Sequence, residues 1–170
     1  MHHSITRALV AALVGLALSA PFAVHAQSGL TVSLTAHRVA VDARGRESFA
    51  QANQAKPGEV VEYRAAYRNT NGAAVREVQA TLPIPDGMEY VARTASPKPA
   101  LASLDGRTFE PLPLKRKVRL PNGRQALREV PPGEYRFLRW SLGSIAAGQA
   151  ETVRARVRVV PLVAAATSAR

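Results

Sequence analysis

The stretch that decides the fold lies near the end of the sequence, at residues 139–159, and reads RWSLGSIAAGQAETVRARVRV. Its only tryptophan, Trp140, shares one face with Leu138 and Leu142, the period-2 pattern of a strand buried on one side. Residues 146–148 (AAG) predict a turn. The valines and Ala155 then alternate with Thr152 and arginines, so we expect a second strand with its apolar side chains inward and its arginines, Arg154, Arg156 and Arg158, in water.

The same alternation extends backwards along the chain. It covers residues 30–36, where the apolar phase moves after His37 to Val39 and Val41, which predicts a bulge or a strand that changes sheets. Residues 46–58 are mostly polar and predict a loop. Alternation resumes over residues 60–68, which predicts a strand. Asn71-Gly72 then predicts a tight turn, and residues 78–84 predict the strand that follows it. Pro83 and Pro85 predict that the returning strand ends at a sheet edge.

These patterns predict an all-β fold, an immunoglobulin-like antiparallel β-sandwich of about seven strands. Turn signals recur along the chain, and no stretch has the apolar period of an amphipathic helix of three turns. A barrel is the alternative, but nothing in the pattern indicates a lumen. The core is expected to contain Val61, Tyr63, Tyr67, Leu138, Trp140, Leu142, Val153 and Val157.

Residues 1–26 have the organisation of a cleavable signal peptide. Arg7 precedes an unbroken apolar run at residues 8–18, and Val24-His25-Ala26 offers a cleavage site. The run is far shorter than the roughly 20 residues that cross a bilayer, so cleavage is favoured over retention as an anchor. We therefore expect a domain at 27–162, a tail at 163–170 and no transmembrane span in the mature chain. The expected location is the periplasm, with the cell surface or the extracellular space as alternatives.

Composition limits the classes of partner. The sequence has no cysteine, which excludes a disulfide framework and leaves stability to the core. Its formal net charge is +11, and only one of its basic side chains lies in the signal. A strongly basic exported chain attracts anionic polymers, lipid head groups or acidic proteins, whereas export argues against a nucleic-acid partner. A coding preference for arginine explains the charge equally well.

Residues 113–130 interrupt the regular pattern. Leu114, Val118 and Leu120 share one face, and residues 121–123 (PNG) form a turn signal, so the segment predicts a hairpin. Its cations are the candidate anion- or partner-binding residues: Lys115, Arg116, Lys117, Arg119, Arg124 and Arg128. The alternative is a solvated edge hairpin whose charges discourage aggregation.

Residues 55–63, 67–91 and 138–159, with the opening strand, resemble the bacterial conserved-repeat family known as domain of unknown function eleven. The resemblance covers about two thirds of the mature chain. It implies an Ig-like sandwich at the bacterial surface or in the periplasm, often repeated within larger adhesive or structural proteins, and it supplies no catalytic residue. The chain differs from that pattern as a lone copy with a basic excursion.

Catalytic and metal chemistry find little support in the residues. His37 is the only histidine after the signal, too few for a zinc site or a nucleophile-base pair. Asp42, Asp86 and Asp105 lie near glycines but lack the spacing of a calcium loop. Glu59 and Glu62 fall on mixed faces of a strand, unlike the paired acids of a glycosidase. We therefore expect that the protein is not an enzyme and that it binds no metal and no cofactor.

The sequence thus predicts a non-catalytic exported module that acts by protein–protein contact as a structural or accessory component of the envelope. The alternative is a binding module for anionic envelope polymers through residues 115–128.

Overall fold

The computed structural model describes residues 29–160. The signal peptide expected at 1–26 and the tail expected at 163–170 lie outside these residues. Within them, no helix is long and apolar enough to span a bilayer.

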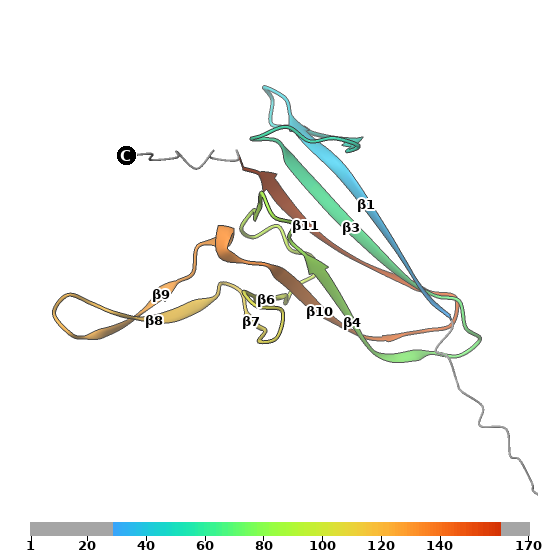
Figure 1. Cartoon of the computed structure of the whole chain (residues 1–170). Coiled ribbons are helices and arrows are strands. Elements are labelled where there is room, and N and C mark those ends of the chain that lie inside the picture. Colours follow the sequence, from blue (N-terminus) through green and yellow to red (C-terminus); the bar gives the residue numbers. More distant parts are fainter. Residues whose placement is uncertain (1–28, 161–170) are drawn as a thin grey trace, which may run out of the picture.

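The fold is all-β, and every strand pairing is antiparallel (Figure 1). A five-stranded sheet has the order β2-β1-β3-β11-β5, and a four-stranded sheet has the order β4-β10-β6-β7. The strands of the first sheet are β1 (Leu30–Val41), β2 (Glu47–Gln51), β3 (Val60–Asn69), β11 (Ala150–Val159) and β5 (Met88–Tyr90). Those of the second are β4 (Val75–Pro83), β10 (Phe137–Ile145), β6 (Leu101–Ser103) and β7 (Glu110–Pro111).

Two further strands form a separate hairpin, β8 (Lys115–Arg119) and β9 (Gln125–Glu129), followed by the short 3₁₀ helix η1 (Pro132–Glu134). The described residues therefore hold eleven strands rather than about seven, nine in the two large sheets and two in the hairpin.

The two large sheets enclose one apolar core, because alternate side chains of both sheets point into the same space. Of the eight expected core residues, Val61, Tyr67, Leu138, Trp140, Val153 and Val157 are buried, and Tyr63 and Leu142 are partly buried against the same core. Between Ser141 and Ile145 the pairing of β10 with β4 shifts register, and Leu142 lies in this irregular segment.

Trp140 is the largest fully buried side chain of the described residues. Its indole N–H donates a hydrogen bond of 2.9 Å to the carbonyl oxygen of Pro97. The ring thus fills the core and also ties the loop after β5 to β10. A buried indole needs such a partner for its N–H, and here a loop carbonyl supplies it.

The prediction of a bulge or of a strand that changes sheets near His37 is wrong, because β1 stays in the five-stranded sheet. β1 pairs with β3 without a register shift from Leu30 to Val39. The apolar phase moves for another reason: Val39 lies opposite Phe49 of β2, on the outer face of the sheet. The segment expected to be a loop at 46–58 therefore contains a strand, β2, whose Phe49 lies on this outer face.

A second correction concerns Arg156, expected in water. Its side chain is only 22% exposed and donates hydrogen bonds to Glu62 (2.9 Å) and to both carboxylate oxygens of Glu47 (2.6 Å each). Arg64 bonds the other oxygen of Glu62, and the guanidinium groups of both arginines lie over the ring of Phe49. This outer-face cluster, Glu47, Phe49, Glu62, Arg64 and Arg156, links β2, β3 and β11.

We expect Trp140→Ala to lower the free energy of unfolding by about 3–5 kcal/mol, because it leaves a cavity and removes the donor to Pro97. Trp140→Phe keeps an aromatic ring and removes the donor, and its cost should be about 1–2 kcal/mol. Urea unfolding followed by circular dichroism measures both values. A loss under about 1 kcal/mol for the alanine variant would contradict the central role of the ring.

We also expect stability to fall in acid because of Glu62. Burial disfavours its ionised form, but the hydrogen bonds from Arg156 and Arg64 outweigh burial and lower the pKa of Glu62 below its ordinary value of 4.5. The unfolded chain therefore takes up this proton at a higher pH than the folded chain does. The stabilisation is complete above about pH 4.5 and is lost as the pH falls through the lower pKa of the folded protein.

Glu62→Gln should cost about 2 kcal/mol at pH 7 and flatten the dependence of stability on pH below 4.5. Glu151→Gln, at an exposed carboxylate on β11, is the matched control. Equal acid sensitivity in the wild type and Glu62→Gln would show that other carboxylates govern acid unfolding.

Candidate functional site

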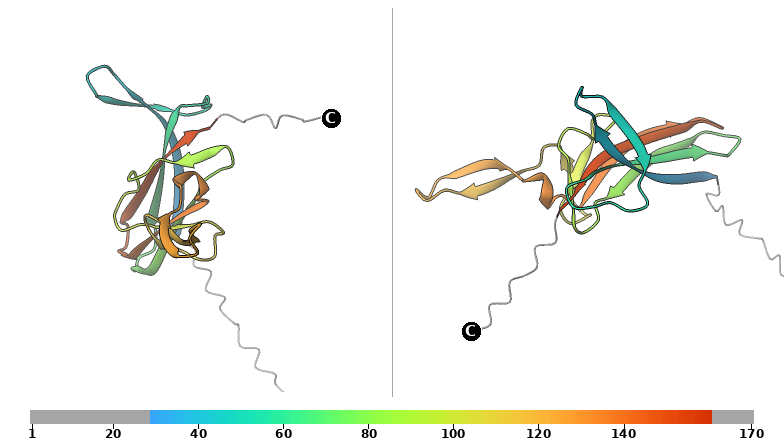
Figure 2. Two further views of the ribbon diagram at one scale, coloured as in Figure 1. Left: turned by 90° about the vertical axis from the view of Figure 1, so that its left-hand side faces the viewer. Right: turned by 90° about the horizontal axis from the view of Figure 1, so that it is seen from above.

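The β8–β9 hairpin stands clear of both large sheets, and two perpendicular views agree on this (Figures 1 and 2). Among residues 29–160 its strands pair only with each other, with Arg116 opposite Arg128 and Val118 opposite Ala126. The hairpin expected at 113–130 is thus present, and it projects from the body as an arm.

All six candidate cations lie on this arm, but on two faces. Residues directly opposite each other in a ladder share a face, so the register divides the set. One face carries Lys115, Lys117 and Arg119, and the other carries Arg116, Arg124 and Arg128. Of these six cations, only Arg116 has a carboxylate of residues 29–160 within 4.0 Å, the paired oxygens of Glu134 at 2.8 and 3.1 Å.

The root of the arm is fixed to the body by a buried tyrosine. The amide of Leu114 donates to the hydroxyl oxygen of Tyr135 at 3.1 Å, and the amide of Val130 donates to the carbonyl of Leu114 at 2.8 Å. Leu114, Val130 and Tyr135 are all buried, and burial raises the pKa of the Tyr135 hydroxyl. The arm therefore leaves the core at a defined point.

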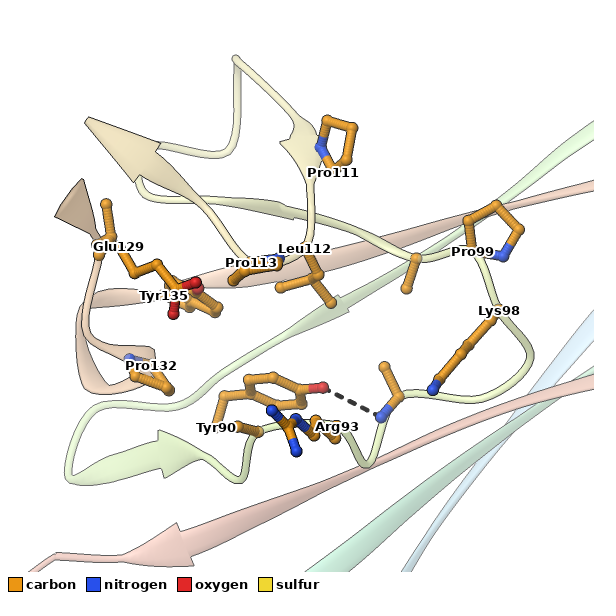
Figure 3. A pocket seen from close by; sticks show the side chains of 14 residues that line it. Tyr90, Arg93, Lys98, Pro99, Pro111, Leu112, Pro113, Glu129, Pro132 and Tyr135 are labelled. Carbon is orange, nitrogen blue, oxygen red and sulfur yellow. Dashed lines mark hydrogen bonds between the residues drawn. The ribbon is translucent and has the colours of Figure 1, made fainter. Parts of the chain in front are cut away.

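A pocket of about 610 Å³ lies beside this root (Figure 3). Its walls come from the loop after β5, from the segment between β7 and β8, and from the segment between β9 and β10. They are mostly apolar: Leu112, Val130, Tyr90, Tyr135, four prolines and three alanines. The rings of Tyr90 and Tyr135 stack with their centroids 5.9 Å apart and their planes at 21°.

Three charged side chains line the pocket at different places. Figure 3 shows Arg93 and Lys98 on the loop that follows Tyr90, and Glu129 across the pocket beside Tyr135. Neither Arg93 nor Lys98 has a carboxylate within 4.0 Å among residues 29–160. Sequence reasoning missed this pocket, because its residues come from three irregular segments. The density of prolines at 97–113 was the available signal.

Two of the aspartates considered as metal ligands hold turns of the backbone. The amides of Thr108 and Arg107 donate to the carboxylate of Asp105 and lower its pKa, and backbone and side-chain hydrogen bonds from Arg46 do the same for Asp42. Both aspartates hold their own turns in this way. His37 lies half-buried on β1, opposite Glu62 of β3.

Comparison with protein-family models, with curated proteins and with solved structures found no match. The resemblance to the conserved-repeat family therefore stays a prediction from the residues.

Tyr135→Phe tests how the arm is held. It removes the acceptor of a buried amide, so we expect a loss of about 1–2 kcal/mol in the free energy of unfolding. Tyr63→Phe is the control, because within residues 29–160 the Tyr63 hydroxyl hydrogen-bonds only to the sulfur of Met88, at 3.6 Å. Hydrogen exchange at the Leu114 amide should speed up in Tyr135→Phe alone. Unchanged protection there would show that the hydroxyl does not hold the arm.

Proposed function

We propose that the chain is a non-catalytic exported module that works by protein–protein contact, with the β8–β9 hairpin as its contact element. The observation that carries the proposal is the projection of this arm from the body, paired with nothing but itself in the described chain. A lone two-stranded ribbon is at best marginally stable in water. Its extension into solvent adds little to the stability of the core, which favours a role in binding.

The side chains of the arm favour a protein as its partner. Leu127 is 66% exposed, and Val118 and Ala126 lie partly exposed on the opposite face. Arg116 lies directly opposite Arg128, and like charges in this position destabilise a ladder. An acidic protein surface with an apolar patch would suit the face that carries Leu127. There it would neutralise Lys115, Lys117 and Arg119, which have no carboxylate partner in residues 29–160.

The rest of the proposal concerns location and architecture. Two antiparallel sheets around one core support an immunoglobulin-like sandwich, the architecture that the family resemblance implies. The organisation of residues 1–26 supports export, and the periplasm is the proposed place of action. In this setting the module would be a structural or accessory component of the envelope.

Site-specific photocrosslinking in intact cells tests the arm. A photoreactive residue at Leu127 should crosslink one discrete protein, whereas the same residue at Ala147, in the exposed β10–β11 turn, should not. Lys115→Glu with Lys117→Glu and Arg119→Glu should reduce the crosslinked product at least tenfold. An undiminished product in this triple variant, or equal crosslinking from both positions, would contradict the arm as the contact element.

A second candidate function is binding of an anionic envelope polymer. One observation favours it: Lys115, Lys117 and Arg119 form a row along one strand face, at backbone positions about 7 Å apart. Binding of this kind should weaken steeply with salt, because exposed charges are screened. Retention of the purified protein on an immobilised polyanion, eluted by a salt gradient, measures it. Retention that the triple variant leaves unchanged would exclude this function.

A further inference from the structure

We infer that the pocket beside the arm is a binding site for a single anionic amphiphile, a molecule with one apolar chain and a carboxylate or phosphate head. The chain would lie along Leu112 and the prolines of the pocket, and Arg93 and Lys98 would hold the head. This inference goes beyond the proposed protein contact and does not depend on it.

The size and the lining of the pocket support an apolar chain. Its volume of about 610 Å³ is within the range of small-molecule sites, which are mostly apolar with a few placed polar groups. The hydroxyl oxygens of Tyr90 and Tyr135 already accept hydrogen bonds from the amides of Ala95 and Leu114. Both tyrosines are buried, so they form the base of the pocket, and the apolar surface open to methylene groups comes from Leu112 and the prolines.

The charges of the pocket support an anionic head at one place. Arg93 and Lys98 lie on one loop, and Glu129 lies across the pocket from them (Figure 3). A head bound at Arg93 and Lys98 therefore avoids the carboxylate of Glu129. A cationic head has only Glu129 to pair with, and the two cations of the loop would repel it.

The backbone conformation of Arg93 supports a role for its side chain in binding. Its φ is 66°, in the left-handed region where a glycine is at ease and an arginine is strained. It lies in the turn closed by the Thr94 amide and the Val91 carbonyl, at the third position, where turns of this kind favour glycine. Strained residues of this sort cluster at binding sites, and this one places a cation at the pocket.

The loop that carries Arg93 is held before any ligand arrives. Besides the Ala95–Tyr90 bond, the hydroxyl of Thr94 donates to the Val91 carbonyl at 2.6 Å and accepts from the Arg156 amide at 3.0 Å. Pro97 is tied to Trp140. A preorganised loop lowers the ordering cost of binding.

Titration calorimetry on the folded protein with dodecanoate and dodecyl phosphate, each below its micelle concentration, tests the site. We expect both to bind one to one, and dodecyltrimethylammonium to bind at least tenfold more weakly. A cation that binds as tightly as the two anions would overturn the inference, as would no binding of either anion.

Variants then locate the site. Arg93→Gly removes the cation while favouring the observed backbone, so the protein should stay folded and its affinity for dodecanoate should fall about tenfold, as loss of one charged hydrogen bond would give. Glu77→Gly is the matched control, since Glu77 is also left-handed, with a φ of 56°, and does not line the pocket. Equal affinity in Arg93→Gly and the wild type would overturn the role of Arg93.

Two further measurements keep the test decisive. Ala92→Trp should fill the pocket and abolish binding, and Ala74→Trp, at an exposed turn position outside the pocket, should not. Vesicles of anionic phospholipid distinguish a single amphiphile from a membrane surface. Binding to vesicles alone, lost in the triple variant of the arm and kept in Ala92→Trp, would overturn the pocket site and leave the proposed function of the arm standing.

Discussion

The burial of Trp140 is the constraint on which the rest of the structure depends. The indole fills the space between the two large sheets, and its N–H reaches the Pro97 carbonyl. One side chain thus joins the core to the loop that lines the pocket. The chain has no cysteine, so this packing, rather than a covalent link, keeps the loop in place.

A second set of interactions secures the opposite side of the five-stranded sheet. Glu62 is buried on its outer face and is satisfied by two arginines, one of which also reaches Glu47 of β2. Removing one member of such a group leaves a buried charge without compensation, so its members act as a unit. The sheet is therefore apolar on one face and ionic on part of the other.

The alternation in the sequence predicted the main strands and the core well, because period-2 burial leaves a direct trace in residue order. Val61, Trp140 and Val157 are buried where the pattern placed them. The pattern failed at Arg156 and Phe49, because their outer face is covered by contacts between segments far apart in the chain.

The arm and the pocket also differ in how far the sequence predicts them. The cations of the arm are neighbours in sequence and could be listed from it, as could the turn at residues 121–123. The pocket combines Arg93, Leu112 and Tyr135 from three irregular segments, and no local pattern connects them. The pocket forms through the packing of segments that are far apart in the sequence, so no short stretch of the sequence predicts it.

The position of β11 affects how the molecule is made. This strand comes last among those described, yet it lies between β3 and β5 in the sheet. Until a ribosome has released residues 150–159, the sheet lacks an interior member and Glu62 lacks its second arginine. The native core therefore cannot close before residues 150–159 have been made, and until then the chain remains open to binding by chaperones.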